Sequence, residues 1–181
     1  TIDNRVVAGL SEGRILWSDD EGATWQKSAD SLPGLNELNT VGDVVYASTR
    51  GGLYQSTDKG TSWGRVNGPW KSSNIHWTAG VKDTVFVTTT EATYRNLNGS
   101  GFTPLVAAFT PGTMTNFTTV RLRNGLLFAT GTPAVYVSSD VGDTWQQKSF
   151  DGTNAIISQF FYKDHYYILT DRGVIWRSLI P

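Results

Sequence analysis

The octapeptide SDDEGATW at residues 18–25 recurs as STDKGTSW at residues 56–63 and as SSDVGDTW at residues 138–145. All three copies have the pattern Ser-x-Asp-x-Gly-x-Thr/Ser-Trp. Three copies of so specific a pattern in 181 residues indicate an internal repeat rather than a coincidence. Because each repeat of such a chain is one structural unit, the sequence around each copy should fold in the same way.

The repeat extends beyond the octapeptide to two short apolar runs in front of it, which are typical of buried strands. These runs lie at residues 6–9 and 15–17, 44–47 and 53–55, and 126–129 and 135–137. Two further stretches, residues 82–102 and 163–178, have the same layout without an intact octapeptide. In the first of these, Asn98 stands in the Asp position and Phe102 near the Trp position.

The spacing of the repeat predicts the size of one unit. Asp20, Asp58, Asn98 and Asp140 follow one another at intervals of 38, 40 and 42 residues. That period suits four short strands joined by tight turns, which is the size of one propeller blade. The five units that we expect within one domain, residues 1–181, are 1–32, 33–70, 71–110, 111–152 and 153–181.

The motif resembles the Asp-box, or bacterial neuraminidase repeat, of β-propellers. It occurs in sialidases, some xyloglucanases, sortilin-type receptors, photosystem assembly factors and secreted bacterial proteins. The resemblance implies an all-β fold, a small β-propeller of about five blades of short antiparallel strands. In this family the box joins the third and fourth strands of a blade, so the two terminal blades should be incomplete. Three explanations stay open: a small five-bladed ring, a processed fragment, or a second copy or partner chain that completes the terminal blades.

Composition narrows the functional classes. The net charge of −1 gives no basic surface for nucleic acid, and no apolar run approaches the roughly 20 residues that span a bilayer. Cysteine is absent, and His76 and His165 are too few and too far apart to suggest a zinc site. We therefore expect no metal, no cofactor, no nucleic acid and no membrane insertion.

The residues of the box have structural roles in this interpretation. Asp and Ser side chains fix turns by bonding nearby backbone N–H groups, the glycines should have positive φ, and the Trp rings should pack under the turn and between blades. Trp63→Ala should then cost about 3–5 kcal/mol. The expected structural residues are Asp20, Asp58, Asp140, Trp25, Trp63 and Trp145.

Catalytic constellations are missing from the sequence. A sialidase needs three arginines, a Tyr nucleophile with a Glu, and an Asp, and it carries an Arg-Ile-Pro signature; Gly13-Arg14-Ile15-Leu16 is the nearest match. A glycosidase of the xyloglucanase kind needs two facing carboxylates. Glu37 lies on an expected innermost strand, but no carboxylate stands at the matching position of another unit. We therefore expect no enzyme and no catalytic residue.

The residues that the repeat does not explain suggest a binding site. The segment 67–77 is long and aromatic, and its Trp70, His76 and Trp77 could meet a sugar ring. Asn36 and Asn116 stand near the starts of other inner strands and could face the same channel mouth. The alternatives are that both Trp rings fill space between blades, that His76 is a structural histidine, and that the two Asn residues make strand-end hydrogen bonds. Residues 160–162 could form an exposed patch for a partner if the ring is open.

The sequence thus predicts a non-catalytic binding module that recognises a glycan, as a lectin does, at or outside the cell surface. The alternatives are a protein–protein adhesin or assembly scaffold, and a remnant of a sialidase-type glycoside hydrolase. The partners would be a glycan or a surface protein, with a homo-oligomer as one outcome. A bacterial, secreted origin is implied by the resemblance alone.

Overall fold

The computed structural model describes residues 4–71, 74–81, 83–105, 119–131, 134–148 and 156–180. All of its regular secondary structure in these ranges is antiparallel β-sheet. The described residues include no helix that is both long and apolar enough to span a bilayer. The chain divides into two compact units, residues 1–105 and residues 106–181.

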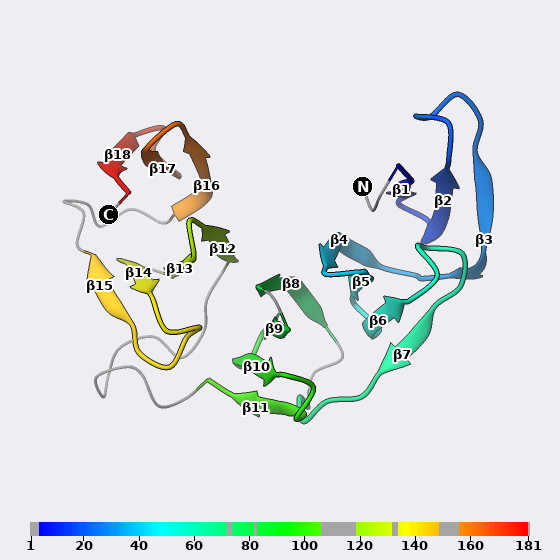
Figure 1. The fold of residues 1–181 in the computed structure, drawn as a ribbon, viewed down its shortest axis with the longest axis horizontal. Helices are drawn as coiled ribbons and strands as arrows, with labels where there is room; N and C mark the ends of the chain where they lie inside the picture. Colours follow the sequence, from blue (N-terminus) through cyan, green and yellow to red (C-terminus); the bar gives the residue numbers. More distant parts are fainter. Residues whose placement is uncertain are drawn as a thin grey trace. The chain divides into compact units, whose positions relative to one another are not determined.

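Unit 1 contains three sheets whose strands follow one another in chain order (Figure 1). The first sheet consists of β1 (Val6–Gly9), β2 (Arg14–Ser18) and β3 (Gln26–Ser31). The second consists of β4 (Leu35–Val41), β5 (Val44–Thr49), β6 (Gly52–Ser56) and β7 (Gly64–Val66). The third is β8 (Ile75–Val81), β9 (Thr84–Thr89), β10 (Thr93–Leu97) and β11 (Phe102–Pro104).

Unit 2 contains two sheets of the same kind. The first of them consists of β12 (Thr119–Arg123), β13 (Leu126–Gly131), β14 (Ala134–Ser138) and β15 (Gln146–Lys148). The second consists of β16 (Ile156–Tyr162), β17 (His165–Thr170) and β18 (Ile175–Leu179). We call the five sheets blades 1 to 5 in chain order.

The strand count of each blade confirms the predicted fold, a small β-propeller with incomplete terminal blades. In blades 2 and 4 the octapeptide joins the third strand to the fourth, and in blade 1 it joins β2 to β3. Blade 1 therefore has the second to fourth strands of a blade among the described residues, and blade 5 has the first to third. Each blade lies within one of the five expected sequence units.

The three boxes share one set of hydrogen bonds. In the first, Ser18 Oγ accepts from the Gly22 N–H at 2.8 Å, and Asp20 accepts from the backbone and hydroxyl of Thr24 at 2.8 and 2.6 Å. The second and third boxes repeat these bonds to within 0.1 Å. The hydrogen bonds from Thr24 lower the pKa of Asp20 to about 2.

The turn of each box requires positive φ at two consecutive residues, as type I′ hairpin turns do. The glycines have φ of 94°, 91° and 89°, as predicted, and the residues before them, Glu21, Lys59 and Val141, have φ of 59°, 58° and 60°. The expected fourth box differs. Asn98 has φ of 50° in a shorter turn, and it is the Asn96 side chain that accepts from the Gly101 N–H at 3.2 Å.

Each core cluster lies between neighbouring blades. Ile15, Leu32 and Ala47 form the core between blades 1 and 2, with Trp63 packed against them. A second cluster joins blades 2 and 3 around Leu53, Ile75 and Val87. In unit 2 a third cluster joins blades 4 and 5; its buried members are Phe128, Val135, Tyr166 and Ile168. The blades of each unit are thus held together by the apolar faces of their sheets.

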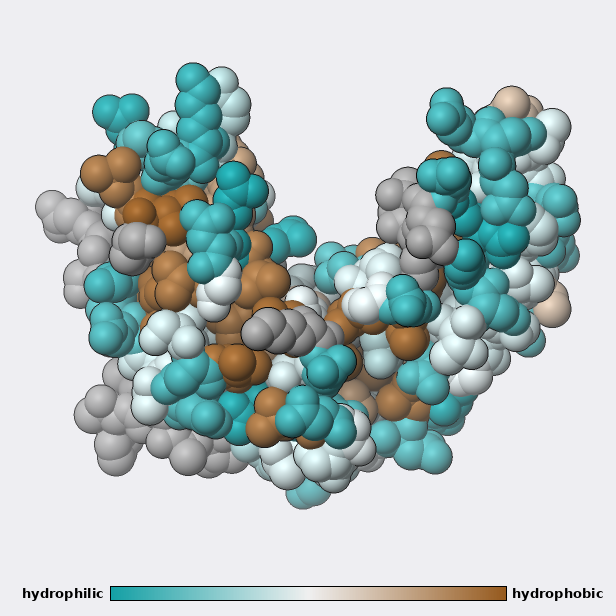
Figure 2. Space-filling model, in the orientation of Figure 1, coloured by the Kyte–Doolittle hydropathy of each residue, from teal (hydrophilic) through white to brown (hydrophobic). Residues whose placement is uncertain are grey.

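Blade 5 also carries exposed apolar side chains, which contribute to the hydrophobic surface that Figure 2 shows on unit 2. Phe160 and Tyr162 are exposed, and the Phe160 ring stacks on Tyr167 with centroids 4.9 Å apart. Phe161, between them, is half-buried and packs edge-on against Phe128. The predicted patch at residues 160–162 therefore consists of alternate residues, because successive strand side chains point to opposite faces.

Candidate functional site

The first strand of three blades contains a β-bulge at the same place. At each bulge, residues i and i+2 of the first strand pair with two consecutive residues of the second strand. Residue i+1, which lies between them, has no partner in the ladder. The pairs are Leu35 with Thr49 and Glu37 with Ser48, Ile75 with Thr89 and Trp77 with Thr88, and Ile156 with Thr170 and Ser158 with Leu169. The extra residues Asn36, His76 and Ile157 are all exposed. Bulges of this kind re-aim side chains and are frequent beside functional sites.

In unit 1 two of these bulges are neighbours. The Asn36 side-chain amide donates to the Ile75 carbonyl at 2.8 Å and to Asn74 Oδ1 at 3.1 Å. Asn36 is therefore bonded to Ile75, the residue that precedes His76 in the chain. The structure brings together two of the residues that the sequence singled out, and it uses the Asn36 amide in a strand-end hydrogen bond, which was the alternative interpretation.

Polar side chains of β4 continue this contact along β8. Glu37 Oε2 accepts from the Thr78 N–H at 3.5 Å, and Asn39 Nδ2 donates to the Thr78 carbonyl at 2.6 Å. The hydroxyls of Ser48 and Thr78 are 2.6 Å apart. The bonds of Glu37 and Asn39 occupy the backbone N–H and C=O of Thr78 on the edge of β8 that faces β4, as expected where a strand edge is protected. They give Glu37 a structural role that the sequence did not explain.

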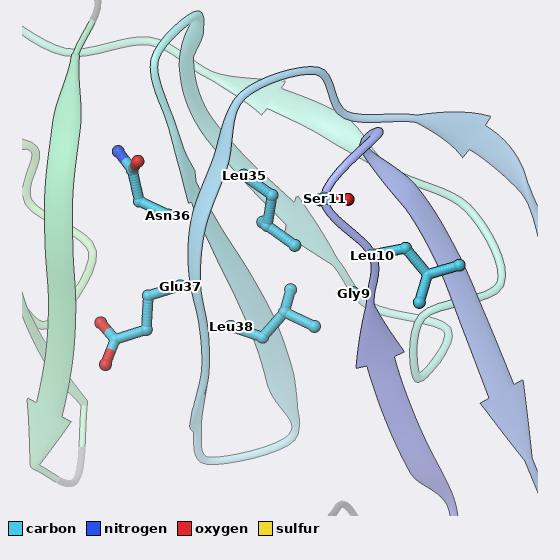
Figure 3. A pocket seen from close by; sticks show the side chains of 7 residues that line it. All are labelled: Gly9, Leu10, Ser11, Leu35, Asn36, Glu37 and Leu38. Carbon is cyan, nitrogen blue, oxygen red and sulfur yellow. The ribbon is translucent and has the colours of Figure 1, made fainter.

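A cavity of about 290 Å³ lies on the other side of β4, between blades 1 and 2. Its lining residues are Gly9, Leu10, Ser11, Leu35, Asn36, Glu37 and Leu38. Figure 3 shows Leu35 and Leu38 pointing toward β1, whereas the Asn36 and Glu37 side chains point away toward β8. A Cβ at Gly9 would overlap the end of the Leu35 side chain, so Leu35 would have to move to accommodate a larger residue there. The lining thus combines leucines with polar residues, so it offers both apolar and polar contacts.

The two tryptophans of the predicted glycan site do not join this surface. Ile75 and Trp77 lie on opposite faces of β8 because the bulge gives them consecutive partners, and Trp77 is only 5% exposed. Trp70 packs edge-on against Tyr94 and Phe102, with ring centroids 5.7 and 5.1 Å apart. The expected aromatic platform is therefore not assembled, and both rings fill space in the blade packing. Asn116 lies outside the described residues.

The three box tryptophans differ in their surroundings. Trp63 packs in the core between blades 1 and 2, as predicted, and Trp145 is half-buried with its Nε1 donating to the Gly142 carbonyl at 3.1 Å. Trp25 is 43% exposed, so its expected packing between blades is wrong. It belongs to blade 1, and within unit 1 no blade precedes that blade to cover the ring.

Charged residues of the described ranges form no cluster with catalytic spacing around the cavity. Glu37 is the one carboxylate among the lining residues, and its side chain points to β8. Arg14 pairs with Glu12 at 3.0 Å on the surface, in keeping with a strand-end charge. No group of three or more His, Asp or Glu residues able to hold a metal is present within the parts of the chain that the structure describes.

The bulges and the cavity were missed by reasoning from the sequence. The signal that could have revealed the bulges is their recurrence, because an extra residue at one place in several repeats would shift the alternation of each inner strand in the same way. The cavity had no signal, since it depends on how blade 1 packs on blade 2.

Comparisons with known proteins bear on the fold. Neither a protein-family model nor a curated protein sequence matches the chain. Among solved structures it is similar to the extracellular domain of a protein described as a one-component system from B. thetaiotaomicron, with a TM-score of 0.78 and 15% identity over 98% of this chain and 25% of that one. It is also similar to YCF48 bound to D1 peptide, with a TM-score of 0.70 and 15% identity over 97% of this chain and 62% of that one.

A third similar structure is an ancestral GH74 enzyme, with a TM-score of 0.65 and 16% identity over 93% of this chain and 26% of that one. The chain thus spans less than two thirds of the length of each of these proteins. They are β-propeller proteins, and at such low identity they support the fold alone.

Proposed function

We propose that the chain is a non-catalytic binding module that recognises a segment of another polypeptide. The observation that carries the proposal is the leucine-lined cavity between blades 1 and 2, from which the Glu37 carboxylate is turned away. A cavity that combines apolar side chains with a few polar groups is the usual form of a binding site. The same arrangement offers no pair of facing carboxylates for glycoside hydrolysis.

The similar structures support this assignment. YCF48 was solved with D1 peptide, so a propeller of related fold binds a peptide. The extracellular domain from B. thetaiotaomicron supports our proposal that this chain acts at or outside the cell surface, and in a bacterium. The shared hydrogen bonds of the three boxes support membership of the Asp-box repeat proteins.

Glycan recognition is the second candidate, and one observation favours it. The bulge of β8 turns His76 outward beside Asn36, and imidazole and amide groups can bond sugar hydroxyls. We place it second because Trp77 is buried and Trp70 packs against Tyr94 and Phe102, which leaves the site without the ring face on which a sugar stacks.

A parallel screen separates the candidates. The chain is tested against a displayed peptide library, a glycan array and a fluorogenic sialoside, each with the variants Leu10→Ser and His76→Ala and with Thr103→Ala on β11 as control. We expect peptide binding that falls about tenfold, or roughly 1.4 kcal/mol, with Leu10→Ser alone. Glycan binding lost in His76→Ala would establish the second candidate instead. Hydrolysis of the sialoside, or binding in none of the screens, would contradict the proposal.

A further inference from the structure

We propose that Arg121 and Arg123 of β12 bind an acidic segment of another polypeptide, one that carries two carboxylates two residues apart. This site lies in unit 2 and uses no residue of the cavity over Gly9, so the inference goes beyond the proposed function. Both arginines are exposed. Neither side chain forms an ion pair or a hydrogen bond with the residues that the structure describes.

The register of blade 4 determines where the two arginines point. Arg121 lies opposite Phe128 in the ladder with β13. Arg123, two residues later, lies opposite Leu126 on the same face of the sheet. Phe128 belongs to the core cluster between blades 4 and 5, and Leu126 packs against that cluster. The arginines therefore extend from the face of blade 4 that is turned toward blade 5, at the margin of the core.

The equivalent positions of blade 2 have another use. Val41 and Arg123 are each the last residue of an inner strand, and a two-residue turn follows each of them. Asn39 is thus the counterpart of Arg121. Asn39 bonds to the Thr78 carbonyl of the next inner strand, and Val41 is buried in the core between blades 2 and 3. Unit 1 joins two blades through these positions, whereas unit 2 presents two cations to water.

The facing strand explains the difference. Val41 packs against Gly80 of β8, where a Cβ would overlap the Val41 side chain. Phe161 takes the place of Gly80 in blade 5, since each is the next-to-last residue of its inner strand. The Phe161 ring packs edge-on against Phe128, with centroids 5.1 Å apart, and so occupies the space between the blades. A side chain at position 123 is thereby kept out of the core, and an arginine there reaches solvent.

The two cations lack a counter-charge. Side chains two residues apart on one face of a strand are separated by about 7 Å, and like charges at that distance repel each other. Burial raises the pKa of Tyr166, and the Arg121 charge opposes this shift, so the guanidinium lies near the Tyr166 hydroxyl. That hydroxyl donates to Gln159 and is no counter-ion. An anion bound by both arginines relieves the repulsion, which favours its binding.

The geometry of the pair suits carboxylates on an extended polypeptide. A guanidinium presents parallel N–H groups that match the two oxygens of a carboxylate, and groups of arginines recognise acidic motifs. In an extended segment, side chains two residues apart lie on one side with the same spacing of about 7 Å. A nucleic acid or a sulfated polysaccharide calls for a larger basic surface, and the net charge of this chain is −1.

Titration with matched peptides tests the site. The probe is the blocked peptide Thr-Glu-Thr-Glu-Thr, followed through the NMR signals of the arginine Nε–H groups. One control, Thr-Gln-Thr-Gln-Thr, has no charge, and the other, Thr-Thr-Glu-Glu-Thr, has the same composition as the probe with adjacent glutamates. We expect the probe to shift the signals of Arg121 and Arg123 and to bind at least about fivefold more tightly than either control. Its affinity should fall between 0.1 and 1 M NaCl, where the screening length shortens from about 10 to 3 Å.

Variants assign the binding to these side chains. Arg121→Gln combined with Arg123→Gln should lower the affinity for the probe at least about tenfold. The corresponding double lysine variant keeps the charge without the forked donors and should bind with an intermediate affinity. Arg177→Gln on β18 removes the same charge from an exposed site opposite Tyr167 and should change nothing. Thermal melts check that each variant is folded, and the two acidic peptides remain decisive on the parent chain if one is not.

The other outcomes overturn the inference. Equal affinity for the two acidic peptides, or a loss in Arg177→Gln as large as in the double glutamine variant, would mean general attraction without a site. Tighter binding of a sulfated oligosaccharide or an oligonucleotide through both arginines would replace the polypeptide as the occupant. Leu10→Ser should leave the probe unaffected. Library peptides that need Leu10, with no preference for the probe, would remove this inference and leave the proposed function intact.

Discussion

The boxes at residues 18–25 and 56–63 have the same internal structure and different surroundings. Their hydrogen bonds agree to within 0.1 Å, and their turn residues have the same φ to within 3°. The second box packs on blade 1, whereas within unit 1 no blade precedes blade 1 to receive the first box. Trp63 accordingly belongs to a core cluster, while Trp25 is 43% exposed.

The contacts of the second box with blade 1 are specific. The Thr61 carbonyl accepts from the Ala29 N–H at 3.0 Å and from the Ser28 hydroxyl at 2.9 Å. The Trp63 N–H donates to Asp30 Oδ2 at 2.8 Å. The box is therefore a self-contained turn, and its larger contribution to stability comes from docking on the preceding blade. Substitutions in the two boxes can separate these contributions.

The tryptophans should give the largest difference. Trp63→Ala removes a ring that packs with Ile15 and Leu32, so we expect a loss of about 2–4 kcal/mol in the free energy of unfolding, slightly below a fully buried ring. Trp25→Ala should cost about 1 kcal/mol or less, because much of its ring already meets water. Urea titrations followed by circular dichroism measure both. Equal losses would mean that docking on a neighbouring blade is not what the Trp contributes.

The box glycines give the next effect. Alanine at Gly22 or Gly60 must adopt φ near +90°, which costs about 1–2 kcal/mol in either box. Gly60→Ala also brings a Cβ to 3.0 Å from both methyl groups of Val7, whereas the nearest atom at Gly22 is 3.4 Å away on Trp25. Gly60→Ala should therefore lose about 1 kcal/mol more, from overpacking against blade 1. If the melts of the two variants coincide, Val7 moves aside freely and the contact is loose.

The box aspartates should show how alike the turns are. Burial raises the pKa of Asp58, but hydrogen bonds from Ser62 outweigh it, and the pKa falls from 3.8 to about 2. The pKa of Asp20 falls to about 2 through hydrogen bonds from Thr24. A depressed carboxyl pKa stabilises the fold above about pH 4, and this stabilisation is lost as the pH falls toward 2.

Asp58→Asn and Asp20→Asn should accordingly be less stable than the parent chain at pH 7, and both deficits should shrink between pH 4 and pH 2. Urea titrations at several pH values check this. A deficit that is independent of pH in one box would show that its carboxylate does not titrate as the hydrogen bonds indicate.

The comparison also explains which features could be predicted from the sequence. The boxes, the blade count and the incomplete terminal blades follow from residues whose roles are local, such as Asp20 and Gly22 within one turn. The exposure of Trp25 could not be predicted, because the same motif packs in blade 2. Of the two neighbouring candidates, His76 is exposed and Trp77 is buried, because a bulge, which depends on pairing with β9, sets the alternation of β8.

The smallest effect concerns Arg5, which links the two boxes. Its guanidinium donates to both carboxylate oxygens of Asp19 in the first box, at 2.6 and 2.9 Å, and to the Thr61 hydroxyl in the second at 2.9 Å, and it lies 3.9 Å from the Trp17 ring centroid. Arg5→Lys cannot keep this forked geometry, so it should destabilise the chain by less than either glycine variant.

Since the Asp19 side chain is 57% exposed, the effect of Arg5→Lys should shrink between 0.1 and 1 M NaCl, where the screening length falls from about 10 to 3 Å. Thermal melts at the two salt concentrations measure it, with Arg123→Lys on the exposed part of β12 as control. An effect that salt leaves unchanged would assign the role of Arg5 to its stacking on Trp17 and its bond to Thr61. The two boxes would then be joined by packing rather than by charge.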